Sequence, residues 1–258
     1  MNMNQTLIFF IATAAVNLFT FSASAQEVLF ERNALNFVTQ TNRCSEVVAQ
    51  GSQPPRFIVD ENGYLTYSGD GDFGLVFIDQ QYRNFQLDLE VSVPSGHFEY
   101  ANSGIFFRSK DPRRLDHPGL PEEIIQLAKN RTPGFVSNWS SYEVQLLAGT
   151  NLGGPSANKT NGAFYGVPEG ASQGQQTRSE YKFDPGETYQ VRLVVIEQDF
   201  KVYMKWAKSA DFVLVAAMTN SDPTRSFEPG YVGLQSYYSN GGSVRALRFS
   251  KVTIHELR

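Results

Sequence analysis

Apolar and polar residues alternate along much of the chain with the period of two that a β-strand produces. The clearest example is residues 85–93, where every second residue is apolar: Phe85, Leu87, Leu89, Val91 and Val93. Successive side chains of a strand point to opposite faces, so this segment predicts a strand with one face in a core. Two β-rich runs, 189–197 and 200–206, predict a hairpin with Gln198-Asp199 as its turn.

Glycine-containing turn signals separate other apolar runs. Asn62-Gly63 lies between residues 57–59 and 64–66, and this dipeptide is typical of a two-residue hairpin turn. Asn240-Gly241-Gly242 separates residues 231–238 from residues 244–257 in the same way. Strand signals recur over residues 26–258 with no internal repeat and no low-complexity linker. This pattern predicts one all-β domain, either a sandwich or a barrel.

Residues 110–138 interrupt the strand pattern with four prolines: Pro112, Pro118, Pro121 and Pro133. Proline suits the first position of a helix and acidic residues suit its first turn, so Pro121-Glu122-Glu123 predicts a short helix that ends near Lys129. Loops of this length are uncommon unless they serve a site or move. We interpret the segment as an insertion between two strands, which either closes over a ligand or decorates the rim.

The N-terminal residues resemble an export signal. Leu7 to Phe21 form an almost unbroken apolar run, and the small residues Ala23-x-Ala25 follow it. This pattern predicts a signal peptide over residues 1–25 with cleavage before Gln26. The alternative is a membrane anchor, but the run is shorter than the roughly 20 apolar residues that a spanning helix needs. We therefore expect an exported, soluble protein, periplasmic or secreted, with no membrane attachment after cleavage.

Composition excludes several classes of protein. Hydrophobic residues make up 41% of the 258 residues, which is too much apolar material for a disordered chain. Lys and Arg number 22 against 26 Asp and Glu, and the resulting net charge of −4 argues against nucleic acid as a partner. Cys44 is the only cysteine, so neither an internal disulfide nor a Cys-x-x-Cys metal site can form.

Two segments combine polar residues with a strand pattern. In residues 101–108, Asn102, Gly104, Phe106 and Arg108 share one face of the predicted strand. In residues 141–147, Glu143 and Gln145 share one face while their neighbours suit a core. An acid within an otherwise buried strand needs a partner, and Arg108 is the obvious partner for Glu143.

These segments resemble the 3-keto-disaccharide hydrolase domain, formerly a domain of unknown function, over roughly residues 28–257. The resemblance rests on short motifs in a fixed order: Val28-Leu29-Phe30, Gly63-Tyr64-Leu65, Asn84-Phe85-Gln86-Leu87, Asn102-Ser103-Gly104-Ile105-Phe106-Phe107-Arg108, Tyr142-Glu143-Val144-Gln145, Gly162-Ala163-Phe164-Tyr165-Gly166 and Gly233-Leu234-Gln235. It implies an all-β, concanavalin A-like jelly-roll β-sandwich, here with one long insertion that contains a short helix.

The resemblance also implies an activity, the cleavage of glycosides that are already oxidised at C3 of the sugar, at a site on the concave face. That chemistry needs a general base, a group that stabilises negative charge on the ketone oxygen, and ligands for the sugar hydroxyls. Our hypothesis assigns Glu143 as base or acid and Arg108 as electrostatic stabiliser. Substrate-binding roles are assigned to five further residues: Asn102, Gln145, Tyr165, Gln235 and Tyr237.

The chain departs from the family pattern at three places. Family members often carry Asp where this chain has Ala148, His where it has Tyr237, and an Arg-Asn pair where it has Ser250-Lys251. We interpret these changes as a loss of polar side chains near the expected site. They leave open a diverged specificity, and also a non-catalytic carbohydrate-binding module of the same fold. A structural or adhesive exported domain is the third alternative.

Several residues also have a purely structural interpretation. Arg108 and Glu143 fit a structural ion pair inside the sheet, and Asp70-Gly71-Asp72 fits a turn better than a calcium site. Trp139 and Trp206 fit a core position better than a sugar platform. The sequence predicts no certain cofactor and leaves a divalent metal and the oligomeric state open; carbohydrate is the expected ligand.

Overall fold

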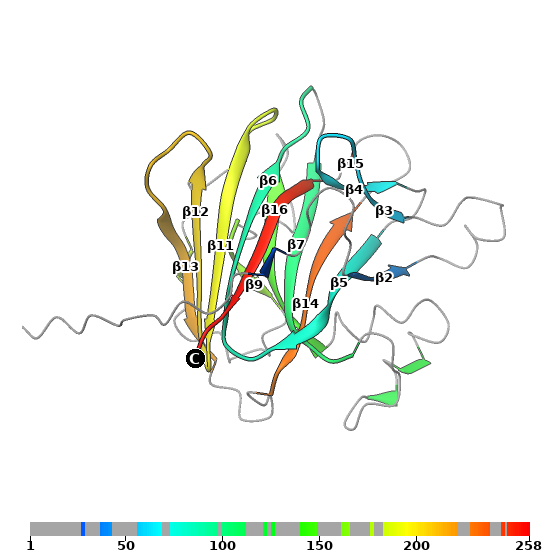
Figure 1. Ribbon diagram of the computed structural model, residues 1–258, viewed down its shortest axis with the longest axis vertical. Coiled ribbons are helices and arrows are strands. Elements are labelled where there is room, and N and C mark those ends of the chain that lie inside the picture. Colours follow the sequence, from blue (N-terminus) through cyan, green and yellow to red (C-terminus); the bar gives the residue numbers. More distant parts are fainter. Residues whose placement is uncertain are drawn as a thin grey trace, which may run out of the picture.

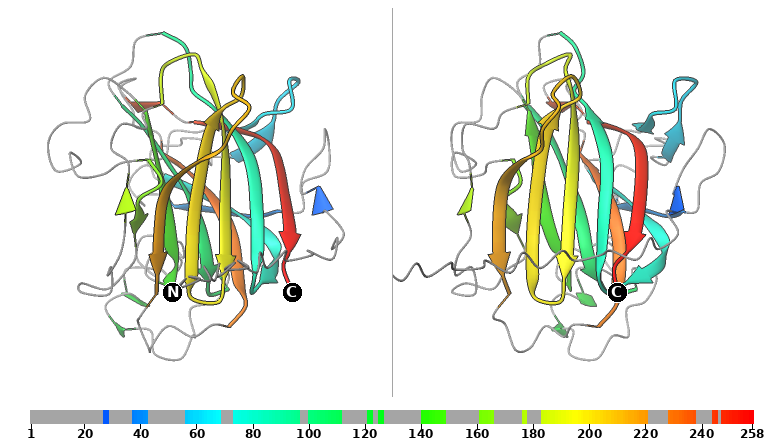
Figure 2. Two further views of the ribbon diagram at one scale, coloured as in Figure 1. Left: turned by 90° about the vertical axis from the view of Figure 1, so that its left-hand side faces the viewer. Right: turned by 60° about the vertical axis from the view of Figure 1, so that its left-hand side comes forward.

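Two sheets stacked face to face form the molecule, as the computed structural model shows (Figures 1 and 2). The structure describes residues 27–28, 37–42, 56–68, 73–96, 100–111, 121–122, 125–126, 140–148, 161–165, 176–177, 183–220, 228–237, 244–245 and 247–258. Within each sheet, the paired strands that the structure describes are antiparallel, except that β15 (Val244–Arg245) runs parallel to β7 (Tyr100–Ser109).

The first sheet has nine strands among the described residues. Its order is β10 (Gln176–Thr177), β13 (Val213–Thr219), β12 (Asp199–Trp206), β11 (Thr188–Ile196), β6 (Phe85–Ser92), β16 (Arg248–Glu256), β4 (Leu65–Ser68) and β3 (Arg56–Val59), with β1 (Glu27–Val28) also pairing β16. Figure 2 shows its long strands β6, β11, β12 and β13 side by side in front of the second sheet.

The second sheet has seven strands among the described residues. Its order is β2 (Phe37–Asn42), β5 (Phe73–Tyr82), β14 (Gly230–Tyr237), β7, β8 (Tyr142–Ala148) and β9 (Phe164–Tyr165), with β15 beside β7. Strands far apart in sequence are neighbours here, since β14 lies between β5 and β7. This arrangement brings residues near 104, 145 and 235 into one row.

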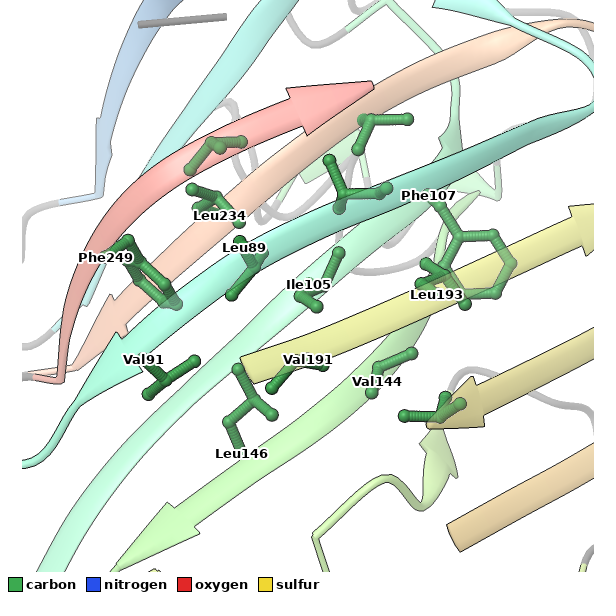
Figure 3. Packing of buried hydrophobic residues seen from close by; sticks show 14 of the residues in the cluster. Leu89, Val91, Ile105, Phe107, Val144, Leu146, Val191, Leu193, Leu234 and Phe249 are labelled. Carbon is green, nitrogen blue, oxygen red and sulfur yellow. The ribbon is translucent and has the colours of Figure 1, made fainter. Parts of the chain in front are cut away.

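One apolar core fills the space between the sheets (Figure 3). Leu89 and Val91 of β6 face it from the nine-stranded sheet, and Ile105 of β7 and Val144 of β8 face it from the seven-stranded sheet. The alternation predicted for residues 85–93 is confirmed, because Phe85, Leu87, Leu89, Val91 and Val93 are each at most 2% exposed. Burying such side chains is the main driving force for joining the two sheets. The predicted all-β sandwich is therefore correct.

Two of the predicted turns form hairpins with different turn residues. β11 and β12 pair from Tyr189–Trp206 to Ile196–Asp199, so the turn is Glu197-Gln198 rather than Gln198-Asp199. Glu197 adopts a left-handed φ of 48°, and its N–H donates to Asn84 Oδ1 at 2.8 Å. That side-chain contact, which a turn propensity does not contain, sets the turn one residue earlier.

The Asn62-Gly63 signal marks a hairpin, but its loop is longer than two residues. β3 and β4 pair up to Val59 and Leu65, which leaves Asp60 to Tyr64 in the loop. Asp60 Oδ1 accepts hydrogen bonds from the N–H groups of Asn62 and Tyr64, both at 2.9 Å. The Asp60 side chain therefore organises the loop, and Gly63 provides its left-handed residue at φ 81°.

The hairpin predicted around Asn240-Gly241-Gly242 is wrong. β14 and β16 lie in different sheets, and between them β15 pairs with β7. The chain therefore crosses from one sheet to the other between β14 and β16. Local turn residues cannot distinguish a hairpin from a crossover between sheets, because both need a change of direction.

Other predictions fall partly or wholly outside the described residues. Residues 1–25, Cys44, Asp70-Gly71-Asp72 and Trp139 lie outside them, as does most of the 110–138 insertion. Within the insertion, Glu122, Ile125 and Gln126 are helical, and Ile125 N–H donates to Pro121 O at 3.1 Å. The expectation that Trp206 is a core residue is wrong, since it is 53% exposed. Within the described ranges, no helix has the length and apolar character needed to span a membrane.

Candidate functional site

A row of polar and small residues crosses the seven-stranded sheet on its outer face, which we define as the face turned away from the core. Gly104 of β7 pairs with Gln235 of β14 on one side and with Gln145 of β8 on the other. Paired residues of antiparallel strands share a face, so the two amides flank the position that lacks a side chain. The register therefore places Gln145 and Gln235, two of the predicted substrate ligands, on either side of Gly104.

Glu143 lies in the neighbouring row and leans over Gly104. An ideal Cβ built on Gly104 would come 2.9 Å from Glu143 Cγ and 3.0 Å from Cδ. Glu143 itself pairs with Phe106 of β7 and with Tyr165 of β9. The carboxylate therefore occupies the space that glycine leaves between the two amides.

Hydrogen bonds orient one of these amides. Gln145 is 4% exposed, and its Nε2 donates to Asn102 Oδ1 and, at 3.1 Å, to the Ser103 carbonyl oxygen. Asn102 and Gln145 are thereby coupled across β7 and β8. Gln145 is fixed by the sheet, so we assign it as a residue that positions Asn102.

Gln235 differs from Gln145 in having an unsatisfied oxygen. Its side chain is 5% exposed, and Oε1 is buried without a hydrogen-bond partner. A buried acceptor without a partner costs free energy, on the order of 1–3 kcal/mol, unless a ligand supplies a donor. The main chain at this position is held in place, because Ser103 Oγ donates to the Gln235 carbonyl oxygen.

Aromatic side chains border the polar row on the same face. Phe77, Phe106 and Tyr231 form an apolar cluster separate from the main core, and all three are buried. Gly233 allows this packing, since a Cβ there would lie 2.7 Å from the Phe77 ring. The row thus has a firm apolar wall beside Glu143.

The two predicted tyrosine ligands are placed only by their strands. Tyr165 pairs with Glu143 in the β8–β9 register, and Tyr237 pairs with Phe73 at the end of β14. Their side chains lie outside the described part of the structure. The register sets Tyr165 beside Glu143 and puts Tyr237 two residues beyond Gln235 on the same strand.

Arg108 does not join this group, contrary to the proposed pairing with Glu143. Its Nη2 donates to the carbonyl oxygens of Arg83, at 3.0 Å, and Glu197, at 2.8 Å. Arg83 lies in the connection from β5 of the seven-stranded sheet to β6 of the nine-stranded sheet, and Glu197 lies in the turn after β11. Burial lowers the pKa of the Arg108 guanidinium, the largest of several effects. Arg108 therefore links the two sheets.

A break in the strand alternation explains the position of Arg108. Phe106 pairs with Gly233 and Ser109 with Tyr231, so three steps along β7 match two along β14. This is a β-bulge, and Arg108 has a left-handed φ of 56° within it. The simple period of two holds through Phe107, which faces the core, and fails at Arg108, whose side chain turns to the other side of the sheet.

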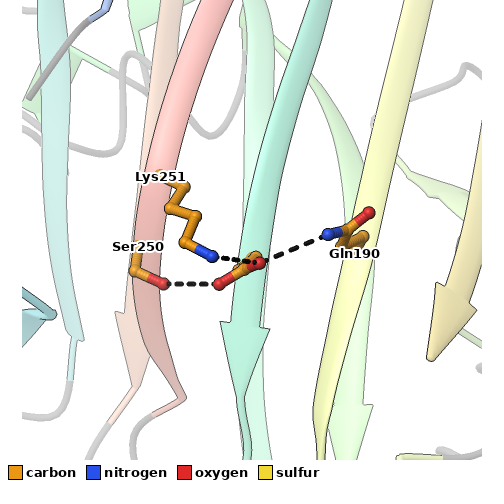
Figure 4. Close-up of polar contacts among 4 residues, drawn as sticks. Gln190, Ser250 and Lys251 are labelled. Atoms are coloured by element: carbon orange, nitrogen blue, oxygen red, sulfur yellow. Dashed lines mark hydrogen bonds and ion pairs between the residues drawn. The ribbon is translucent and has the colours of Figure 1, made fainter. Parts of the chain in front are cut away.

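Two of the departures from the family pattern also lie away from the row. Ala148 is fully buried in the main core, on the opposite face of β8 from Glu143 and Gln145. Ser250 and Lys251 lie on the other sheet, where Ser250 Oγ and Lys251 Nζ contact Glu90 at 3.4 and 2.9 Å (Figure 4). The interpretation that these changes remove polar groups near the site is therefore wrong for both positions.

Sequence reasoning missed the role of Gly104. A glycine inside a strand signals close approach of another group, and that signal was present at position 104. Which group approaches depends on the β7–β8 register, which no local pattern gives. Among the residues that the structure describes, no three His, Cys, Asp or Glu side chains gather as a metal site.

Known structures share this fold at low sequence identity. They include a proposed glycosyl hydrolase from Parabacteroides distasonis ATCC 8503, at 17% identity and TM-score 0.50, covering 90% of this chain and 84% of that one. Lectin II from Ulex europaeus matches at 11% identity and TM-score 0.53, covering 91% and 98%. Winged bean acidic lectin matches at 10% identity and TM-score 0.50, covering 90% of this chain and 97% of that one. These likenesses support the predicted concanavalin A-like jelly roll.

The sequence comparison is more specific. No curated protein matches the chain. The sequence profile of the 3-keto-alpha-glucoside-1,2-lyase-like domain matches it over residues 28–255. Because that match covers most of the 258 residues, the chain belongs to the 3-keto-alpha-glucoside-1,2-lyase-like domain family.

Proposed function

We propose that the protein cleaves glycosides oxidised at C3 of the sugar, on the outer face of the seven-stranded sheet. One observation carries this proposal: the Glu143 carboxylate lies over Gly104, beside the buried, unpartnered Oε1 of Gln235. A base and a hydroxyl acceptor thus share one small area of the sheet. The family to which the chain belongs supports carbohydrate as the substrate class.

The reaction is an elimination followed by addition of water. The C3 ketone acidifies the C2 hydrogen, and Glu143 removes it as a proton. The electron pair of the C2–H bond forms a C1=C2 double bond, and the C1–O bond to the aglycone breaks with its electrons on oxygen. The departing oxygen takes up a proton. Water then adds across the double bond and gives the 3-keto sugar, so the sum is hydrolysis.

The described residues divide the remaining tasks. Gln235 Oε1 accepts a hydrogen bond from a sugar hydroxyl, and Asn102, held by Gln145, orients a second hydroxyl. Tyr165, beside Glu143 in the register, is assigned to contact the sugar ring. Arg108 takes no part in this assignment because its hydrogen bonds go to the carbonyls of Arg83, in the β5–β6 connection, and of Glu197, in the β11–β12 turn.

Release of aglycone from a chromogenic 3-keto-glucoside tests the proposal. We expect turnover by the wild-type chain and a loss of at least about a hundredfold in Glu143→Gln, within the range for removing a general base. Ser250→Ala, on the opposite sheet, is the matched control and should retain full activity. Assays with and without a chelator decide whether a divalent metal is needed. Full activity in a folded Glu143→Gln protein would refute the assignment.

A non-catalytic carbohydrate-binding module is the second candidate function. The lectin folds that the chain resembles favour it, one of them in complex with methyl-alpha-D-galactose. The same assay separates the two candidates. Sugar binding without any release of aglycone, by a protein that is folded, would favour the binding module.

We also propose that the protein is exported, from the apolar run and the Ala23-x-Ala25 pattern. N-terminal sequencing of protein recovered from a periplasmic or culture fraction should begin at Gln26. Recovery of intact Met1 from the membrane fraction would support an anchor in place of a signal peptide.

A further inference from the structure

A second surface suited to a ligand lies on the outer face of the nine-stranded sheet. It is a hollow of about 460 Å³ over β11 and β12, here called the β11–β12 hollow, and its lining includes Arg192, Val194, Asp199, Lys201, Tyr203 and Phe212. The volume lies within the range of small-molecule sites. Since the core separates the two sheets, this hollow and the Glu143 row lie on opposite sides of the sandwich.

Apolar side chains in and beside the hollow are exposed without an evident structural purpose. Ile196 lines it and is 42% exposed, and Leu214, which pairs with Tyr203 in the β12–β13 register, is 39% exposed. Val194 and Tyr203 lie between them on adjacent strands. Single exposed apolar residues are ordinary, but a contiguous group within a hollow marks a binding surface.

Some of the polar side chains are held in place before any ligand arrives. Arg192 Nε donates to Asp88 Oδ1 at 2.7 Å, and Gln86 Nε2 donates to Asp88 Oδ2 at 2.7 Å. The Arg192 guanidinium also lies 4.5 Å from the centroid of the Phe212 ring, and Lys205 Nζ lies 4.9 Å from it. Arg192 and Phe212 therefore form a firm wall, which lowers the entropic cost of binding.

Other polar groups remain available. Among the described residues, neither the Lys201 amine nor the Tyr203 hydroxyl makes a hydrogen bond or ion pair, and Asp199 uses one oxygen on Thr219. The hollow thus offers donors and acceptors around an aromatic ring. Its charges nearly cancel: Arg192, Lys201 and the adjoining Lys205 stand against Asp199 and the adjoining Asp88, which leaves one net positive charge.

We infer that the β11–β12 hollow binds a neutral saccharide, independently of the Glu143 site. A sugar has apolar ring faces that pack on an aromatic side chain, and hydroxyls that both donate and accept hydrogen bonds. A net of only one positive charge among these five side chains disfavours a strongly acidic or basic ligand. A saccharide held on this face leaves the Glu143 row free, so the two surfaces can be occupied together.

Calorimetric titration of the full chain in the Glu143→Gln form, which prevents turnover, tests the inference. The probes are three neutral oligosaccharides: cellohexaose, maltohexaose and xylohexaose. We expect at least one to bind, with affinity reduced at least about tenfold in Tyr203→Ala and about threefold in Lys201→Ala. Affinity should change less than about twofold between low and high salt, since the ligand is uncharged.

Lys208→Ala is the matched control, because the Lys208 side chain is 87% exposed and pairs with Glu187 away from the hollow. It should bind like the parent protein. No binding of any probe, or unchanged binding in both Tyr203→Ala and Lys201→Ala, overturns the inference. A dimer in sedimentation that Ile196→Asp dissociates also overturns it, because a second copy would then cover the hollow. If Tyr203→Ala does not fold, the surface variant Lys201→Glu replaces it.

Failure here and failure of the proposed reaction are distinguishable. Tyr203→Ala in the wild-type background should cleave a small 3-keto-glucoside at the normal rate, since Tyr203 lies on the opposite sheet from Glu143. Oligosaccharide binding without turnover of the 3-keto-glucoside would support the β11–β12 hollow as a binding site and refute only the proposed reaction. Turnover without oligosaccharide binding would support the reaction at Glu143 and overturn saccharide binding in the β11–β12 hollow.

Discussion

Glu143 and Gly104 depend on one another: the carboxylate of the first lies where any side chain at the second would stand. The two residues are diagonal neighbours on β8 and β7, one row apart in the register. Glycine at 104 is therefore a requirement of the candidate base, and the pair provides a direct test of the site.

Gly104→Ala should displace the Glu143 carboxylate and lower kcat/KM for a 3-keto-glucoside by at least about tenfold. Adding Glu143→Asp, which shortens the side chain by one methylene, should restore part of the loss because the clash is relieved. Steady-state kinetics of the single and double variants measure this. Equal activity of Gly104→Ala and the wild-type protein would mean that the carboxylate position is not needed.

Arg108 is expected to act on stability and not on the chemistry. Arg108→Met leaves the carbonyls of Arg83 and Glu197 without their donor, and we expect a loss of about 3 kcal/mol in the free energy of unfolding. Urea denaturation measures this, with Ser109→Ala as a neighbouring control. A hundredfold loss of kcat/KM in a protein of unchanged stability would instead support the role of Arg108 as electrostatic stabiliser in the reaction.

Lys251 has a left-handed φ of 50° at the bulge in β16, a conformation that glycine adopts without strain. Lys251→Gly and Lys251→Ala both remove the amine from Glu90, so their difference isolates the backbone term. We expect the glycine variant to be more stable by about 1 kcal/mol. Thermal unfolding compares them, and a more stable alanine variant would contradict the strained backbone.

Tyr189 should make stability depend on alkaline pH. Burial raises the pKa of its phenol above the ordinary 10.0. The unfolded chain then loses this proton first, so the stability from Tyr189 is full below pH 10 and is lost as pH rises through the folded pKa.

Tyr189→Phe removes this dependence together with the contacts to Asp184 at 2.9 and 3.3 Å. At pH 8 the variant should be less stable by about 1 kcal/mol. Above pH 10 the gap between the two proteins should narrow. Urea denaturation at pH 8, 10 and 11 measures it, and a constant gap would show that Tyr189 ionises alike in both states.

Much of this fold was predictable, because alternation with period two is a local property. It gave the buried face of β6 and the shared face of Asn102, Gly104 and Phe106. The structure differs from the predicted side-chain directions where a β-bulge interrupts the alternation. The bulge at Arg108 depends on the length match between β7 and β14, and that match is a property of the pair of strands. The Ser250-Lys251 bulge on β16 is of the same kind.

Local sequence patterns were sufficient to predict an all-β sandwich that resembles one known family, with Glu143 and Gln145 facing away from the core. Side-chain period, turn residues and motif order carry that information within short stretches. Which strands are neighbours became known from the three-dimensional structure. Hydrogen bonding between distant segments places Gln235 beside Gly104 and Lys251 beside Glu90. It also directs the Arg108 side chain to the carbonyls of Arg83 and Glu197. Partners of this kind follow from register and sheet order, which depend on the packing of the whole core.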